Sequence, residues 1–223
     1  MSPVSEDEIL RLLQAPRSLH DLRTYYAGPA GLYAGRHFNS FARSESEANP
    51  NRFTPGDILA VQCLSVTVPI EVAIDLVEGQ LGDDIAELLV HVPREHDLGS
   101  DRAAEALKTG GEATRAWNLL TKQKGVAAVT AGKLLARKRP RLIPVWDTVV
   151  HCAVGAPKAG EVWLWLNAVF CSIDIQNQLK TLHATAALPD EVSLLRTFDV
   201  VVWMRHRRDH RTSGCNGIDW KAV

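Results

Sequence analysis

A single carboxylate, Asp147, follows a long stretch of chain in which every charged residue is positive. From Ala113 to Trp146 there are eight Lys or Arg residues and no Asp or Glu, in a chain of net charge -1. Asp147 precedes the helical run TVVHCAV, where an N-capping Asp would stabilise the helix by about 1 kcal/mol. A capping carboxylate is held rigidly with one oxygen spare, so capping and catalysis by Asp147 are compatible.

The segment before Asp147 has the features of a helical hairpin. Gly125 lies between a helix expected to end near Gln123 and a second one expected from about Ala128 to Lys138. The first backbone amides of the second helix lack internal partners and carry partial positive charge, which suits a phosphate oxygen. Thr130 and Lys133 would add a hydroxyl and an ammonium nearby. Such a hairpin holds a DNA backbone without reading its sequence.

The basic residues of this region are the expected DNA contacts, together with the turn itself. Four of them are expected to form a solvated or DNA-facing patch, although any one could pair with an acid elsewhere: Arg137, Lys138, Arg139 and Arg141. The full expected DNA-binding set is Lys124, Gly125, Val126, Ala127, Thr130, Lys133, Arg137, Lys138, Arg139 and Arg141. Lys133 most simply contacts phosphate or solvent, with a catalytic role as the alternative.

Helical signals dominate the rest of the chain, so an all-α fold with short connections is predicted. Ser5 and Glu8 occupy capping-box positions, and Thr54 with Pro55 begins another helix. The last segment repeats apolar residues with a helical period, and its β-branched triplet Val200–Val202 is read as part of a buried helix rather than a strand. Further helices are expected at 70–78, 84–90, 100–109, 112–122, 162–172, 176–187 and 190–205.

Two segments do not follow this pattern. Residues 26–53 mix Gly, Ser, Asn and Pro with aromatic residues and are expected to form a long ordered loop in which Tyr33, Phe38 and Phe41 are buried. The loop either has a functional role or is a meandering N-terminal wrap over the helices. Residues 207–223 are expected to form a basic polar tail that is mobile or lies along a phosphate backbone. The expected domain therefore covers residues 1–206, with the hairpin and the Asp147 segment at 117–155.

Composition limits the class of protein. The chain of 223 residues has no apolar run of eighteen residues and no signal-peptide layout, so a cytoplasmic protein with no membrane association is expected. The four cysteines form no C-x-x-C pair, which argues against a zinc ribbon or an iron–sulfur cluster and fits reduced thiols. No metal or cofactor is expected.

The stretch KGVAAVTAGKLLA…IPVWDTVV resembles the helix-hairpin-helix DNA glycosylase superfamily. Gly125, Val126, Thr130 and Ala131 match its hairpin motif. Pro144, Val145, Asp147, Thr148 and Val150 match the segment around its catalytic aspartate, with Trp146 as an extra residue. The whole chain also resembles an uncharacterised, mainly actinobacterial family of unknown function.

The glycosylase resemblance implies an all-α helical bundle with a cleft between two helical lobes, and it implies that Asp147 is the catalytic residue. Val129 stands where bifunctional members carry the Schiff-base lysine, so the resemblance implies a monofunctional enzyme. Ala127 replaces the second hairpin glycine, and Val149 replaces the histidine after the Asp-Thr pair. The superfamily's iron–sulfur cysteines have no counterpart in this chain.

The expected function is hydrolysis of the N-glycosidic bond of a damaged or modified base in double-stranded DNA by a monomeric protein, leaving an abasic site. The base would be extruded into a pocket. Candidates for lining this pocket are Trp146, Tyr33 and His37, although a tryptophan at this position is commonly a core residue. The alternatives are a non-catalytic hairpin module that binds nucleic-acid backbone, and a bifunctional lyase that uses Lys133.

Overall fold

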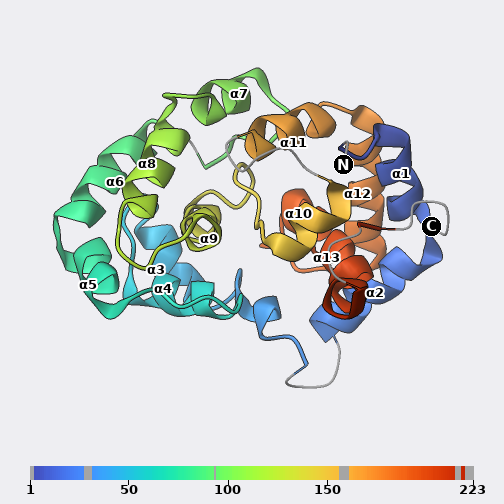
Figure 1. Cartoon of the computed structure of the whole chain (residues 1–223), viewed down its shortest axis with the longest axis horizontal. Coiled ribbons are helices and arrows are strands. Elements are labelled where there is room, and N and C mark those ends of the chain that lie inside the picture. The colour runs from blue at the N-terminus through green and yellow to red at the C-terminus, as the bar shows by residue number, and fades with distance from the viewer. Residues whose placement is uncertain (1–2, 28–31, 93, 156–160, 214–216, 219–223) are drawn as a thin grey trace. The chain divides into compact units, whose positions relative to one another are not determined.

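A computed structural model describes residues 3–27, 32–92, 94–155, 161–213 and 217–218 (Figure 1). All regular elements in these ranges are helices, which confirms the predicted all-α class. Among the described helices, none combines the length and the apolar character that crossing a membrane requires. The chain divides into two compact units, Met1–Tyr33 with Val145–Val223, and Ala34–Pro144. The expected single domain over residues 1–206 stays a prediction.

The first unit, formed by both ends of the chain, is built around its longest helix. Buried residues of α13 include Phe198, Val201 and Val202, each at most 1% exposed, so the β-branched triplet belongs to a buried helix as predicted. α13 packs against α2, α10 and α12, and α1 packs against α12. The helices of this unit are α1 (Glu6–Gln14), α2 (Pro16–Ala27), α10 (Thr148–Val154), α11 (Val162–Phe170), α12 (Ile173–Thr185) and α13 (Leu194–Ser213).

Local signals account for several boundaries in the first unit. Ser5 and Glu8 form the predicted capping box at the start of α1. α2 was not among the predicted helices, although Pro16 at its first position is a favoured start. α13 begins at Leu194 and continues to Ser213, so the expectation that helix gives way to a tail after Arg205 is wrong for residues 206–213. Most of the remaining tail lies outside the described residues.

The second unit surrounds α9. This helix packs against α4 and α8, and α6 packs against α5 and α8. Thr54 and Asp57 form a capping box at the start of α4, with Pro55 at the first position as predicted. The helices of this unit are η1 (Ala34–His37), α3 (Arg43–Ala48), α4 (Pro55–Gln62), α5 (Ile70–Glu78), α6 (Gln80–Val90), α7 (Asp101–Leu107), α8 (Glu112–Thr121) and α9 (Ala128–Lys138).

The segment predicted as a long loop contains regular structure. It includes the end of α2, the short helix η1 and the helix α3, while residues 28–31 lie outside the described ranges. Phe38 is buried at 1% exposure as expected, whereas Phe41 is 43% exposed and its predicted burial is wrong. The backbone of this segment has a structural use, because its carbonyl groups accept hydrogen bonds from the cations of α9.

Candidate functional site

The helical hairpin forms at the predicted place. α8 ends at Thr121, α9 begins at Ala128, and the two helices pack together. Gly125 in the turn has φ +85°, a conformation that favours glycine. A Cβ atom at this position would come within 2.8 Å of Pro69 Cγ. Both the backbone conformation and the close approach therefore explain a glycine here.

The start of α9 is open to solvent at its backbone. Its N-cap, Ala127, provides no side-chain acceptor for the first-turn amides. Ala127 and Ala128 are exposed, as are Lys124 and Gly125. Val126 and Thr130, however, are only 4% and 7% exposed. The expected hairpin contacts that face solvent are therefore the turn backbone and Lys124.

The cations at the end of α9 lie inside the second unit. Arg137 Nε donates to Asp57 Oδ1 at 2.8 Å, and its guanidinium also donates to the carbonyl oxygens of Phe38, Asn39 and Phe41. Lys138 Nζ forms an ion pair with the other oxygen of Asp57 and donates to Asn49 O at 2.9 Å. These contacts tie α9 to α4 and to the preceding segment.

Arg139 is buried in the same way. It is 1% exposed and donates to Pro50 O at 2.9 Å and to Asn51 Oδ1 at 2.6 Å, with further bonds to the carbonyl oxygens of Leu89 and Val92. Burial lowers the pKa of Arg139 to about 10, with a further contribution from the charge of Arg94.

The expectation of a solvated or DNA-facing patch is therefore wrong for Arg137, Lys138 and Arg139. Lys133 is also buried, at 4% exposure, and its Nζ donates to Leu64 O at 2.9 Å. Arg141 is exposed and forms an ion pair with Asp97. The physical reason for the burial is that protein acceptors replace water around these cations. Asp57 pairs with Arg137 and Lys138, and backbone carbonyl oxygens accept hydrogen bonds from all four buried side chains.

Asp147 is the N-cap of α10, as the sequence predicted. Its Oδ1 accepts hydrogen bonds from Val149 N at 2.9 Å and from Val150 N at 3.0 Å. Among the described residues, Oδ2 has no hydrogen-bond partner, and the residue is only half-buried. One carboxylate oxygen is thus fixed by the helix and the other is available. Asp147 and the hairpin belong to different units, so the expectation that they act at one site stays a prediction.

Trp146 packs within an aromatic group of the first unit. Its Nε1 lies 3.4 Å from His151 Nδ1, and its ring makes edge contacts with His151 and Trp165 at centroid distances of 6.1 and 6.4 Å. The ring remains half-buried. These contacts account for Trp146 as a packing residue beside the cap, and its expected role in a base pocket stays a prediction.

A second aromatic group, centred on Tyr25, lies within the electrostatic reach of Asp147. Tyr25 OH accepts a hydrogen bond from Arg196 at 2.6 Å, and Arg196 also forms the predicted ion pair with Asp199. Burial raises the pKa of Tyr25, and the negative charges of Asp199 and Asp147 raise it further, while Arg196 opposes them. The ring of Tyr33 stacks on that of Tyr25 at 5.2 Å.

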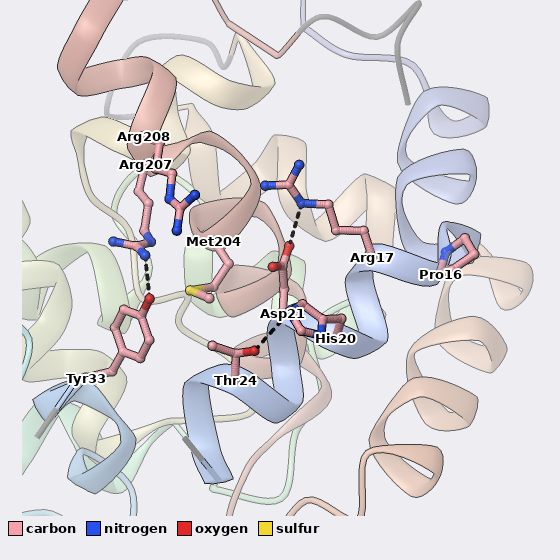
Figure 2. Close-up of a pocket in the computed structure, with 9 residues that line it drawn as sticks. All are labelled: Pro16, Arg17, His20, Asp21, Thr24, Tyr33, Met204, Arg207 and Arg208. Atoms are coloured by element: carbon pink, nitrogen blue, oxygen red, sulfur yellow. Dashed lines mark hydrogen bonds and ion pairs between the residues drawn. The ribbon is translucent and has the colours of Figure 1, made fainter. Parts of the chain in front are cut away.

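Tyr33 also lines a cavity of about 510 Å³ in the first unit (Figure 2). Arg207 donates to Tyr33 OH, and its guanidinium lies over the Tyr33 ring at 4.9 Å. Arg17 approaches Asp21 at 3.6 Å, and burial raises the pKa of Asp21 against the opposing charge of Arg17. Asp147 does not line this cavity. The lining residues are Pro16, Arg17, His20, Asp21, Thr24, Tyr33, Met204, Arg207 and Arg208.

His37 lies in the second unit, at the end of η1. It is exposed, and its Nε2 accepts a hydrogen bond from Arg36 Nε at 3.1 Å. Tyr33 belongs to the first unit and His37 to the second, and their joint role in a base pocket stays a prediction.

A family model for a family of unknown function, DUF6308, matches residues 18–206. The match covers most of the chain and spans both units. The chain belongs to the DUF6308 family. Neither the curated proteins nor the solved structures contain a match to it.

Several residues of this DUF6308 chain were missed as site candidates in the sequence. Tyr25, on a helix that was not predicted, approaches Arg196 from 171 positions away. Arg207 and Arg208 were assigned to a tail but lie on α13 and line the cavity. Cys152, His206 and His210 come together although their spacing contains no metal-binding motif. A continued helical reading through RHRRDH would have placed His206 and His210 one turn apart.

Proposed function

We propose that the protein is a monofunctional DNA glycosylase with Asp147 as its catalytic residue. The observation that carries the proposal is that the two oxygens of the Asp147 carboxylate differ in their hydrogen bonding. Oδ1 is held by two amides of α10, while Oδ2 has no hydrogen-bond partner among the described residues. A carboxylate held in this way is preorganised to face developing positive charge without reorganising during the reaction. The resemblance of the flanking residues to the glycosylase motif supports the same role.

In the proposed reaction, the target nucleotide leaves the base stack and places its sugar beside Asp147. As the bond from C1′ to the base nitrogen lengthens, the sugar gains oxocarbenium character, and the carboxylate stabilises it. A water oxygen then bonds to C1′, Asp147 accepts the water's proton, and the base departs with the bonding electron pair. The products are the free base and an abasic site.

A lyase step is not part of the proposal. Val129, in the first turn of α9, provides no amine where the superfamily's Schiff-base lysine would stand. The alternative amine, that of Lys133, is buried and donates to the carbonyl oxygen of Leu64. A lysine that forms a Schiff base must present a neutral amine to the sugar, so these contacts argue against Lys133 in this role.

The proposed partner is double-stranded DNA, gripped through its phosphates. The exposed turn around Gly125, the uncapped amides of α9 and the ammonium of Lys124 support a backbone contact that does not depend on base sequence. The base that is removed is a damaged or modified one. It ranges from uracil, alkylated purines and oxidised guanine to a hypermodified phage pyrimidine such as glucosylated hydroxymethylcytosine, which would make the enzyme an antiviral one.

The test uses Asp147→Asn, because Asn is as good an N-cap as Asp but lacks the negative charge. The full chain and the variant would be incubated with a panel of modified duplexes and phage genomic DNAs, and alkali-labile sites would be counted. We expect cleavage by the wild type on at least one substrate and a loss of at least 100-fold in Asp147→Asn. Asp174→Asn, an exposed acid in the first turn of α12, is the matched control and should retain activity.

Retained base release in Asp147→Asn would overturn the catalytic role. The second candidate function is a non-catalytic module that grips nucleic-acid backbone, and the same exposed turn of α9 favours it. That reading is distinguished by salt-sensitive DNA binding with no abasic product from any duplex in the panel. Borohydride trapping on DNA separates both from a lyase, since only a Schiff base gives a covalent adduct.

A further inference from the structure

Three metal-ligating side chains meet in the first unit, away from the Asp147 carboxylate. Cys152 lies on α10, and His206 and His210 lie one turn apart on α13. One potential ligand atom from each, the cysteine sulfur and a nitrogen of each imidazole ring, lies within 4.8 Å of the other two. The helices α10 and α13 pack directly against each other (Figure 1). The cluster therefore bridges two elements that are more than fifty positions apart in the sequence.

The two histidines have unused hydrogen-bonding capacity. Nδ1 of His206 and Nδ1 of His210 are buried and have no hydrogen-bond partner among the described residues. His206 Nε2 lies 3.2 Å from Cys152 Sγ, and the two imidazole centroids are 5.6 Å apart. His206 and Cys152 are only 1% and 2% exposed. Buried polar atoms are nearly always satisfied in native proteins, so two orphaned ring nitrogens in one cluster point to a missing ligand.

Cys152 is disulfide-bonded, whereas Cys63 and Cys171 form no disulfide. The expectation that all four thiols are reduced is therefore wrong for Cys152. A disulfide sulfur is a poor metal ligand, because metal coordination by cysteine requires the thiolate. The redox state of Cys152 consequently decides whether this cluster can hold a metal.

We propose that Cys152, His206 and His210 form a redox-gated zinc site. A dithiol reductant transfers two electrons and two protons to the Cys152 disulfide, which becomes two thiols while the reductant becomes a disulfide. Cys152 then loses its proton to solvent as its sulfur and the two neutral imidazoles bind Zn²⁺. Oxidation of the thiols by a disulfide of higher potential reverses these steps and expels the metal.

The chemistry of the donors fits zinc better than a hard cation. Sulfur and imidazole nitrogen are the ligands zinc prefers, whereas calcium and magnesium require oxygen. In a tetrahedral zinc site, bond lengths of about 2.0–2.3 Å place the donor atoms about 3.3–3.8 Å apart. Donors within 4.8 Å of one another reach that geometry by small side-chain rotations. The fourth position would be taken by a solvent molecule.

The site would have a structural consequence for α10. Cys152 lies on the helix whose N-cap is Asp147, so bound zinc would pin that helix to α13. A link between zinc and base excision rests on the proposed function. Zinc binding itself does not, because it is measured without DNA.

The experiment compares the full chain after reduction with a phosphine and after oxidation with diamide. Each sample is incubated with Zn²⁺, desalted and analysed for metal by mass spectrometry, and Co²⁺ is used as a spectroscopic probe. We expect about one zinc per reduced chain, at least ten-fold less in the oxidised chain, and a sulfur-to-cobalt charge-transfer band. Cys152→Ser and His210→Asn should each lower bound zinc at least ten-fold.

Controls separate this site from surface thiols and from misfolding. Cys63→Ser and Cys171→Ser, which alter the two cysteines that form no disulfide, should keep one zinc per chain. Circular dichroism checks that each variant is folded, and His210, which is only half-buried, provides a milder change than Cys152. The proposal is overturned if the reduced chain holds no stoichiometric zinc, or if folded His210→Asn and Cys152→Ser both retain it.

Discussion

Arg137 and Asp57 form a buried ion pair, with Arg137 Nε 2.8 Å from Asp57 Oδ1 and side-chain exposures of 4% and 0%. The other oxygen of Asp57 pairs with Lys138. We expect Asp57→Asn to lower the free energy of unfolding by about 3–5 kcal/mol, because two buried cations would lose their counter-charge. Chemical denaturation of the full chain measures this loss. Asp97→Asn, which breaks the exposed pair with Arg141, should cost under about 1 kcal/mol, and equal losses would contradict the argument.

The same carboxylate should make stability sensitive to acid. Burial alone would raise the pKa of Asp57, but the charge of Lys138 and hydrogen bonds from Lys138, Arg137 and Ser46 outweigh it, so the pKa lies below its ordinary value. The unfolded chain therefore takes up this proton at higher pH than the folded chain. The stabilisation is fully present above the unfolded pKa of about 3.9 and is lost as the pH falls through the folded pKa.

We therefore expect the difference in unfolding free energy between wild type and Asp57→Asn to be constant from pH 7 to about pH 5, and to shrink below about pH 4. Denaturant titrations of both proteins across this range measure it. A difference that grows on acidification would show that the carboxylate is not the stabilising species.

Local signals account for much of what the sequence predicted. The capping boxes at Ser5 and Thr54 and the glycine turn at Gly125 each depend on residues within a few positions, so the neighbouring sequence is sufficient. The helices 70–78 and 128–138 have the predicted bounds for the same reason. The capping role of Asp147 was likewise readable from its place before an apolar helical run.

The failures involve partners that are distant in the chain. The cations of α9 looked solvated because their counter-charge, Asp57, lies 80 positions before Arg137, and most of their acceptors are backbone carbonyls with no sequence signature. The cluster of Cys152 with His206 could not be read from spacing, since it depends on the packing of α10 against α13. The pairing of Tyr25 with Arg196 depends on tertiary packing in the same way.

Gly125 should be more sensitive to substitution than another glycine with the same backbone conformation. Gly110 has φ +83° and open space around an added Cβ, whereas Gly125 has φ +85° and Pro69 Cγ within 2.8 Å. Gly110→Ala should cost about 1–2 kcal/mol of unfolding free energy from backbone strain alone. Gly125→Ala should cost more, because the hairpin must also shift away from Pro69. Denaturation of both variants tests this order. A loss of unfolding free energy in Gly125→Ala that is no larger than the loss in Gly110→Ala would contradict it.

Two substitutions at Asp147 should separate its contribution to stability from its proposed contribution to catalysis. Asp147→Ala removes the acceptor for the amides of Val149 and Val150, so we expect a loss of about 1 kcal/mol in unfolding free energy. Asp147→Asn keeps an acceptor oxygen and should lie within about 0.5 kcal/mol of wild type. Thermal or chemical denaturation measures both. If Asn destabilised as much as Ala, the charge rather than the cap would be the source of stability, and a loss of activity in Asp147→Asn would no longer isolate catalysis.

The burial of Arg137, Lys138 and Arg139 changes what salt should do to DNA binding. A solvated basic run would release many counterions on binding DNA. In the expected DNA-binding set, however, it is Lys124 whose side chain is exposed and forms no ion pair with the described residues. We expect Lys124→Ala to weaken binding equally across DNA sequences and to reduce the slope of log affinity against log salt by about 1. Fluorescence anisotropy with a labelled duplex at several salt concentrations measures it. Lys108→Ala, which removes an exposed lysine already paired with Glu105, should leave the slope unchanged. A slope that Lys124→Ala does not alter would place the phosphate contacts away from the hairpin.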